Sequence, residues 1–457
     1  MLNVNLGRIA QWSGGRLQGD DVRVRGISTD SRRIASGQLF VALVGEHHDG
    51  HAHAADAARL GACAAVVTRP LPIALPQVVV DDTLQALGRI AAGRRRELSA
   101  RVIGITGSNG KTTVKTLTAA ILARHGRTHV NAGNFNNEIG LPLTVLEMPE
   151  DTEYAVLEMG AGKPGDIAYL AAIARPLVGL VTTIAPAHLE RMGSIETVAQ
   201  TKGALYEALP QDGVAVIPAD DRFAPQFDAL AGTRQTLHFG LEQPAQVGAQ
   251  ILAMEAHLSR FVLSTPCGDA QISLPLPGRH NIANALAAAA VACALDVPME
   301  HIVHGLHHAG TVPGRLLRRE MPGGWTLIDD SYNANPGSVR AAIDTLKLVD
   351  GEAWLVLGDM AELGPDGERL HAEVGEYAHA AGIRRLLATG PLSRSACRSF
   401  GPGRGEHFDS QAALLEALRA GLHAGVTCLV KGSRSAGMDR IVAALETSSQ
   451  QGVSHAS

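Results

Sequence analysis

A glycine-rich turn in the first third of the chain carries the residues best suited to hold a polyphosphate. It reads Thr106-Gly107-Ser108-Asn109-Gly110-Lys111-Thr112-Thr113 and stands between an apolar run at 102–106 and a helical pattern at 112–124. Glycines let backbone N–H groups turn inward around phosphate oxygens, and the helix N-terminus adds partial positive charge. Lys111 can bridge phosphates, and the Thr112 hydroxyl can bind Mg²⁺. The turn predicts nucleotide binding by residues 107–113; the alternative is a glycine turn with an incidental lysine.

Two further residues stand where parallel strands are expected to end. Glu158 closes the apolar run 154–157, and His188 follows the run 179–184. The carboxyl end of a strand beside a phosphate loop is the place for a Mg²⁺-binding acid, so we favour a metal role for Glu158 over ordinary surface charge. His188 is expected at the same edge, although a lone histidine is more often structural. Lys202 would be repelled by a metal ion, and its type and spacing alone indicate a solvated helix lysine.

The elements around these residues divide the chain into three α/β domains. Residues 1–82 contain short strand-like runs and one helical pattern at 53–60. Residues 83–312 begin with a helix at 83–97 and continue with alternating strands and helices, which predicts a P-loop-type, mainly parallel sheet flanked by helices. Residues 313–457 show the same alternation and predict a Rossmann-like C-terminal domain. The N-terminal domain is expected to bind substrate, and the central domain ATP.

The composition excludes several classes of protein. A chain of 457 residues is too long for one ordinary core, and its formal charge of −5 argues against general nucleic-acid binding. Five scattered cysteines without a CxxC pair are typical of reduced thiols. The N-terminus lacks the pattern of a signal peptide, and the longest apolar run, 282–295, is too short to span a bilayer. We expect a cytoplasmic protein, a monomer, with no nucleic-acid partner and no stable membrane insertion.

Taken together, these segments resemble the Mur ligase family. The resemblance rests on residues 106–113, 134–140, 277–284 and 329–336, with Glu158, His188 and Lys202, and extends in order from Ser28 to beyond Lys431. It implies that Thr112 and Glu158 hold one Mg²⁺ and that His188 helps to hold a second. It also implies that CO₂ carbamylates Lys202, which converts a repelled cation into an anionic partner of the metal. Lys111, Glu158, His188 and Lys202 form the expected catalytic set.

The resemblance also assigns positions for the substrates. The expected contacts are Ser28, Thr29, Asp30, Ser31 and Arg32 for the UDP end; Asn134, Asn136 and Asn137 for the muramoyl peptide; Asn281 for adenine; Asp330 for ribose; and Asn333 and Asn335 for the amino substrate. Arg315 follows Pro313-Gly314 at a domain junction and can reach phosphate as the third domain closes. The serine, threonine and asparagine positions have structural alternatives: a capped surface turn for 28–32, a plain Asn turn for 134–137 and for Asn333 and Asn335, and a helix–helix hydrogen bond for Asn281. Lys431 and Arg434 either hold a carboxylate or lie at a solvated strand end.

Within the family, three segments resemble the member that adds D-alanyl-D-alanine. They are residues 358–364, 330–336 and 431–435. This implies ATP-dependent ligation of D-alanyl-D-alanine to a UDP-N-acetylmuramoyl tripeptide through an acyl phosphate. The alternatives are a sister ligase that adds one amino acid, or a glutamate to folate, and a nucleotide-binding switch or interaction module without ligation. Against the first, an Asp-Asn-Pro-Arg box typical of the diaminopimelate-adding relative is absent. Ala204 departs from the acidic residue of some relatives, which puts details around Lys202 in doubt.

Overall fold

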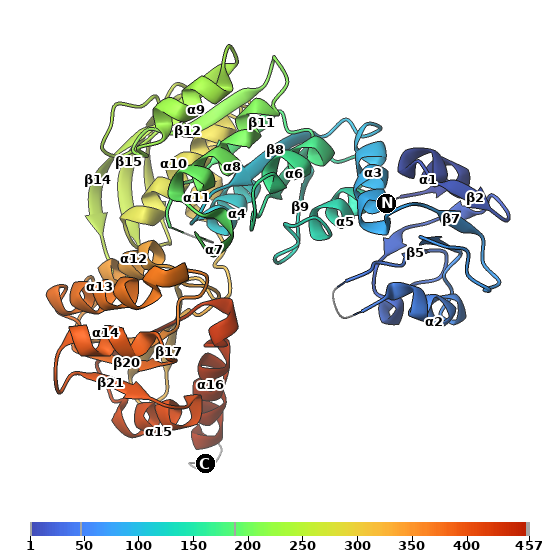
Figure 1. Ribbon diagram of the computed structural model, residues 1–457. Helices are drawn as coiled ribbons and strands as arrows, with labels where there is room; N and C mark the ends of the chain where they lie inside the picture. Colours follow the sequence, from blue (N-terminus) through green and yellow to red (C-terminus); the bar gives the residue numbers. More distant parts are fainter. Residues whose placement is uncertain (1, 46–47, 187–188, 454–457) are drawn as a thin grey trace.

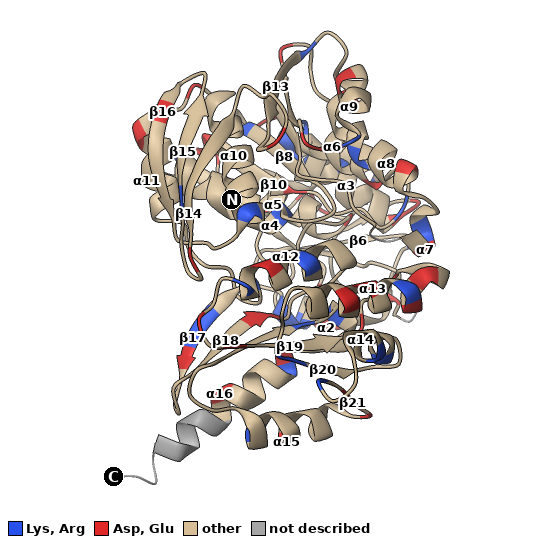
Figure 2. Cartoon of the chain, turned by 90° about the vertical axis from the view of Figure 1, so that its left-hand side faces the viewer, with Lys and Arg blue, Asp and Glu red and all other residues tan. Residues whose placement is uncertain are grey.

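The computed structural model describes residues 2–45, 48–186 and 189–453, and over these the chain forms three α/β parts (Figure 1). The N-terminal and C-terminal parts each adjoin the central part and lie apart from one another. Figure 2 shows acidic and basic residues scattered over the central and C-terminal parts. The three-domain α/β fold expected from the sequence is confirmed.

The N-terminal part is a five-stranded sheet in the order β2-β7-β6-β5-β4, with helices packed against it. Only β2 pairs antiparallel within this sheet. Its strands β1 and β3 form a separate two-stranded ribbon. The sequence patterns did not predict its first helix, which is short and buries Leu6, Ile9 and Trp12. The elements are β1 (Val4–Asn5), α1 (Leu6–Ser13), β2 (Arg16–Gln18), β3 (Arg23–Val24), β4 (Ile27–Ser28), η1 (Ser31–Arg33), β5 (Leu39–Val41), η2 (Gly50–His53), α2 (Ala54–Arg59), β6 (Ala64–Val67) and β7 (Gln77–Val79).

The helix α3 (Thr83–Arg95), which corresponds to the helix predicted at 83–97, joins the N-terminal part to the central part. Asp82 caps its first turn, because the carboxylate accepts hydrogen bonds from the backbone N–H groups of Leu84 and Gln85. At its other end, the guanidinium of Arg95 donates to three backbone carbonyls, including that of Ala174 in the central part at 2.8 Å. These contacts fix where the bridge enters the central part.

The central part is built on a six-stranded sheet in the order β13-β12-β11-β8-β10-β9, and every pairing is parallel. Strand β8 lies in the middle and is apolar and buried over almost its whole length, as expected for a strand covered on both faces. All carboxyl ends therefore meet at one edge. The elements are β8 (Arg101–Thr106), α4 (Lys111–Leu122), β9 (Thr128–Val130), α5 (Gly140–Glu147), β10 (Tyr154–Glu158), α6 (Asp166–Ala174), β11 (Val178–Val181), α7 (Leu189–Met192), α8 (Ile195–Glu207), β12 (Val214–Pro218), α9 (Ala224–Ala231) and β13 (Gln235–Phe239).

A three-stranded antiparallel sheet follows, which the sequence patterns did not predict. It consists of β14 (Gly248–Met254), β15 (Ser259–Thr265) and β16 (Gly268–Leu274). The alanine-rich helix α10 (Arg279–Cys293) contacts both this sheet and helix α4. Its small side chains are almost all buried, which allows this close packing. Helix α11 (Met299–His307) completes the part.

The C-terminal part is a six-stranded mixed sheet in the order β17-β18-β22-β19-β20-β21, with helices on both faces. The sequence patterns predicted strands at 325–328, 353–357, 384–388 and 428–431, which correspond to β18, β19, β20 and β22, but they did not predict the antiparallel edge strand β17 or the parallel edge strand β21. The cysteines are all unpaired, as expected. The elements are β17 (Leu317–Met321), β18 (Trp325–Asp330), α12 (Pro336–Leu346), β19 (Glu352–Gly358), η3 (Gly364–Asp366), α13 (Gly367–Ala380), β20 (Arg385–Thr389), α14 (Ser393–Phe400), β21 (Gly405–Phe408), α15 (Gln411–Gly421), β22 (Val426–Lys431), η4 (Arg434–Ala436) and α16 (Asp439–Val453).

Candidate active site

The phosphate loop connects β8 to α4 at the carboxyl edge of the central sheet. Gly107 and Gly110 have φ values of 143° and 79°, in the region that favours glycine. A Cβ on Gly107 would fall 1.9 Å from Oγ1 of Thr182, the residue directly after β11, so the loop passes too close to this strand end for any side chain. Lys111 Nζ donates to the carbonyl of Gly107 at 2.8 Å. This bond holds the ammonium of Lys111 against the loop, where it would also contact a bound phosphate.

Glu158, at the end of β10, is the carboxylate beside this loop. It is 3 % exposed, and its oxygens accept hydrogen bonds from Thr112 Oγ1 and Asn136 Nδ2, each at 2.9 Å. Burial alone would raise its pKa, but the charges of Lys111 and Lys115 and these two hydrogen bonds outweigh burial, so the pKa is lowered. The acid is therefore ionised at neutral pH.

Two residues that sequence reasoning did not select hold Glu158 in place. Asn131 bonds both backbone groups of Glu158, accepting from its N–H and donating to its carbonyl, each at 3.0 Å. Lys115, one helical turn after Lys111, is 6 % exposed and places Nζ 3.5 Å from Glu158 Oε2. In the sequence, Lys115 has the spacing of any helix lysine. Only its sequence distance from Lys111, which puts both on one face of the helix, could have indicated its role.

The oxygens of Thr112 and Glu158 fit a Mg²⁺ ion. Thr112 Oγ1 and Glu158 Oε2 lie 2.9 Å apart, close to the separation of adjacent ligands around an octahedral Mg²⁺ with bonds of about 2.1 Å. Among the described residues, no cluster of three or more His, Cys, Asp or Glu side chains could hold a metal by itself. A metal here would therefore need further oxygens from a nucleotide, as Mg²⁺ commonly does in phosphoryl-transfer sites.

Lys202 lies in α8 and is not a solvated lysine. It is 2 % exposed, and its pKa is lowered to about 7, chiefly because burial removes the ammonium from water and also because Lys111 repels it. The amine is thus partly neutral at neutral pH, which is the form that reacts with CO₂. His188, expected to help hold a second metal, lies outside the described residues.

A pocket of about 830 Å³ opens at this edge, between the central and C-terminal parts. Its walls contain most of the predicted nucleotide and acceptor positions. Those on its walls are Ser108, Asn109, Gly110, Lys111, Thr113, Asn136, Asn137, Glu158, Asn281, Arg315, Asp330, Asn333 and Asn335. Those that do not line it are Gly107, Thr112, Asn134, Lys202 and residues 28–32.

The C-terminal wall brings charged and amide groups to the phosphate loop. Asn335 Nδ2 donates to Asn109 Oδ1 at 2.7 Å, a direct contact between the two parts. The Arg315 guanidinium lies 4.5 Å from the centroid of the Tyr332 ring. Asp330 is buried and accepts a hydrogen bond from Lys431 Nζ at 2.5 Å. Burial raises the pKa of Asp330 even against the opposing charge of Lys431.

Several expected contact residues bond to their own surroundings here. Lys431 is a buried ion-pair partner, so the solvated strand end expected as its alternative is wrong. Arg434, in contrast, is exposed and pairs with Asp439 at 3.2 Å. Asn281 Nδ2 donates to the carbonyl of Pro277 at 2.8 Å, and Asn137 Oδ1 accepts from the N–H of Gly140 at 2.9 Å. Their side chains would have to exchange these bonds to contact a ligand.

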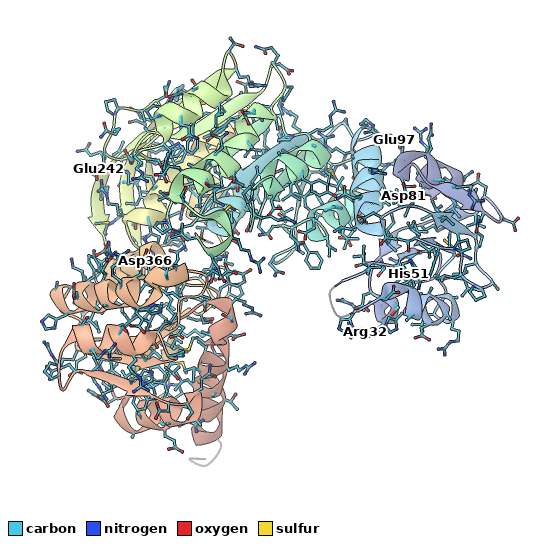
Figure 3. The ribbon with its side chains drawn as sticks, viewed as in Figure 1. Arg32, His51, Asp81, Glu97, Glu242 and Asp366 are labelled. Atoms are coloured by element: carbon cyan, nitrogen blue, oxygen red, sulfur yellow. The ribbon has the colours of Figure 1, made fainter. Side chains whose placement is uncertain are left out.

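The residues expected at the UDP end lie in the N-terminal part, apart from the pocket. Asp30 caps the turn Ser31–Arg33, and its carboxylate also pairs with Arg32 at 3.0 Å. The hydrogen bond from Arg32 lowers the pKa of Asp30. Figure 3 shows Arg32 on the edge of the N-terminal part that is nearer to the C-terminal part. A ligand touching both Arg32 and the phosphate loop would need to be long or the domains would need to move.

These features define an ATP-dependent enzyme of three domains. They are a parallel sheet with a phosphate loop, a carboxylate beside it that could bind Mg²⁺, and a third domain of the Rossmann-like kind. Three family models match the chain: "Mur ligase family, catalytic domain" over residues 23–95, "Mur ligase middle domain" over 105–292, and "Mur ligase, glutamate ligase domain" over 314–434. The chain belongs to the Mur ligase family, as the resemblance in its motifs predicted.

Individual relatives match almost end to end. The chain is 43 % identical to the UDP-N-acetylmuramoyl-tripeptide–D-alanyl-D-alanine ligase of Escherichia coli (strain K12), over 98 % of this chain and 99 % of that protein. It is 34 % identical to the Bacillus subtilis (strain 168) protein of the same name, over 97 % and 98 %. A crystal structure of MurF from Acinetobacter baumannii, 34 % identical, superposes with a TM-score of 0.93 over 98 % of this chain and 99 % of that one.

A further solved relative carries a nucleotide. The MurF ligase from Thermotoga maritima, solved in complex with ADP, is 27 % identical and superposes with a TM-score of 0.84, over 94 % of this chain and 98 % of that one. Along the described ranges of this chain, none of the helices is both long and apolar enough for a transmembrane segment.

Proposed function

We propose that this chain joins D-alanyl-D-alanine to a UDP-N-acetylmuramoyl tripeptide at the expense of ATP, a step of peptidoglycan synthesis. This is the activity in the names of the relatives that match it end to end. The structural observation that supports this activity is the pocket lined by both the phosphate loop and the C-terminal part. A cytoplasmic location follows from this proposal, because ATP is its energy source.

ATP binds across that pocket. Residues 107–113 surround its phosphates, and Arg315 approaches them from the C-terminal side. The electrostatics support this arrangement, since burial lowers the pKa of Lys111 and repulsion by the charge of Arg315 lowers it further. An anionic triphosphate relieves this repulsion. Asn281 is proposed to contact adenine from the central part and Asp330 the ribose from the C-terminal part, since both line the pocket.

The chemistry runs in two steps. The carboxylate of the tripeptide attacks the γ-phosphorus of ATP, and the bond to the β-phosphate oxygen breaks, giving an acyl phosphate and ADP. The free amine of D-alanyl-D-alanine then attacks the acyl carbon, loses a proton, and inorganic phosphate leaves. Lys111 and the backbone N–H groups of the loop hold the transferring oxygens, so positioning and electrostatics supply most of the acceleration.

Thr112 and Glu158 would hold Mg²⁺, with His188 at a second ion. When bound, Mg²⁺ neutralises charge on the transferring phosphoryl group. Lys202 is proposed to be carbamylated, and its buried, partly neutral amine supports this reaction. The carbamate replaces a cation near Lys111 with an anion.

The acceptor peptide lies on the side of the pocket formed by Asn136 and Asn137, with Asn134 nearby, and its UDP end reaches residues 28–32. Asn333 and Asn335 are proposed to contact the dipeptide. Since water would hydrolyse the acyl phosphate, the C-terminal part must close the pocket before phosphoryl transfer. The contact of Asn335 with Asn109 already joins the two walls.

Release of ADP tests the proposal directly. Purified protein with Mg²⁺, ATP and the UDP-linked tripeptide is expected to release ADP at a sustained rate only when D-alanyl-D-alanine is added. Mass spectrometry is expected to find the pentapeptide product. Single amino acids in place of the dipeptide serve as the control for a sister ligase. ADP release that ignores both peptide substrates would instead indicate a nucleotide switch and overturn the proposal.

A further inference from the structure

Lys115 is a buried cation that the ligation chemistry above does not use. It lies on the phosphate-loop helix α4, with its side chain 8 % exposed. Its Nζ donates to the carbonyl of Asn131 at 3.0 Å and of Gly133 at 3.4 Å, and lies 3.5 Å from Glu158 Oε2. A buried charge needs such partners, because they replace the water that the ammonium loses on burial. The contacts link helix α4 to Glu158 at the end of β10 and to the start of the loop at 131–137.

The charge balance around Glu158 is unusual for a metal site. One carboxylate faces the ammonium groups of Lys111 and Lys115, and the charge of Arg315 also reaches Lys111. Sites that bind free divalent cations gather several oxygen anions instead. Since like charges repel strongly in a partly buried site, free Mg²⁺ gains little here until a nucleotide supplies further negative oxygens.

We propose that Lys115 is the internal counter-cation of Glu158, a positioning residue that keeps the carboxylate fixed in the metal-free pocket and disfavours the metal until a triphosphate brings it in. The inference rests on the proposed metal role of Glu158. In this role, which we call the gate, the charge of Lys115 weakens binding of Mg²⁺ by the protein alone. Metal and nucleotide therefore bind together.

Charge and packing can be separated by substitution. Lys115→Met keeps most of the volume of the side chain and removes its charge, whereas Lys115→Arg keeps the charge. Lys347 is exposed at the end of α12 and outside the pocket, so Lys347→Met is the matched control for loss of one lysine. Glu158→Gln removes the proposed metal ligand. Thermal melting establishes that each full-length variant is folded, and Lys115→Gln replaces Lys115→Met if the latter is not.

The measurement is titration of each variant with Mn²⁺ alone by calorimetry, without nucleotide. We expect weak binding by the unaltered protein, by Lys115→Arg and by Lys347→Met, and binding about tenfold tighter or more in Lys115→Met, since a neighbouring positive charge is gone. With a non-hydrolysable ATP analogue present, this difference is expected to shrink. Unchanged or weaker Mn²⁺ binding in Lys115→Met would refute the gate. If the tight Mn²⁺ binding of Lys115→Met persisted after Glu158→Gln was added to it, the proposed metal role of Glu158 would be refuted instead.

Discussion

At the scale of single residues, Lys202 is a buried amine that we propose to be carbamylated. Its pKa of about 7 lies well below the usual value of 10.5, because burial and the charge of Lys111 oppose protonation. The amine is protonated below pH 7 and neutral above it, and only the neutral amine attacks CO₂. We therefore predict that activity at limiting bicarbonate rises with pH through about 7, and that Lys202→Gln lowers kcat roughly a hundredfold, the loss typical for one electrostatic group of an active site.

Carbon-13 NMR with labelled bicarbonate provides the direct measurement, as a carbamate signal is expected in the unaltered protein and not in Lys202→Gln. Folding provides the control. Between about pH 7 and 10.5, Lys202 is protonated in the unfolded chain and neutral in the folded protein. The destabilisation that buried Lys202 causes therefore decreases as the pH rises through this range. Without CO₂, Lys202→Met should thus be more stable than the unaltered protein near pH 7 and equal to it near pH 10.5. A carbamate-free protein with full activity would contradict the role.

Residue types and spacing predicted which groups would gather around the phosphate loop, because strand ends of a parallel sheet share one edge. Thr112 and Glu158, 46 positions apart, do form a hydrogen bond there. The supporting residues Lys115 and Asn131 could not be predicted, since their roles depend on burial, and burial follows from packing. For the same reason Lys202 looked like a solvated lysine until its helix was placed against the sheet.

At the scale of secondary-structure elements, the phosphate loop has its shape because two glycines make it possible. Gly107 combines a φ of 143° with a Cβ position 1.9 Å from Thr182 Oγ1. We predict that Gly107→Ala pushes the loop from β11, lowers stability by about 1–3 kcal/mol and raises the KM for ATP more than that for D-alanyl-D-alanine. Steady-state kinetics and thermal melting measure both effects.

Gly248 in β14 is the matched control for this substitution. Its φ is not in the left-handed region, and a Cβ there would meet only the Gly240 carbonyl oxygen, at 3.6 Å. Gly248→Ala should therefore leave the KM for ATP unchanged. If the two alanine variants behaved alike, the close approach of the loop to β11 would not control nucleotide binding.

Elements with strong periodicity were predictable, and elements set by tertiary contacts were not. The buried strand Tyr154–Glu158 is an uninterrupted apolar run that ends in a charge, so both its type and its end were readable. The strands β14–β16 have mixed faces, and the partner of their buried side is the distant helix α10. A helix of eight residues such as α1 is held mainly by packing, which a local pattern does not reveal.

At the scale of the whole molecule, the pocket depends on how two parts meet. The N-cap of α12 lies at this seam, because Asn335 Oδ1 accepts from the N–H of Ser338 while Nδ2 donates to Asn109 Oδ1. One side chain therefore stabilises a helix of the C-terminal part and also joins that part to the phosphate loop. Substitutions can separate these two tasks, since aspartate caps a helix as well as asparagine but has no N–H to donate.

We predict that Asn335→Asp keeps the melting temperature but weakens closure of the C-terminal part on ATP, because its carboxylate would face Asn109 Oδ1 without a donor. The KM for ATP should rise about fivefold, the equivalent of one hydrogen bond of about 1 kcal/mol. Asn335→Ala should lose both tasks and cost about 1 kcal/mol of stability in addition. Small-angle scattering with an ATP analogue measures closure. Equal compaction in all three proteins would show that other contacts hold the seam, and Asn335 would then be only a helix cap.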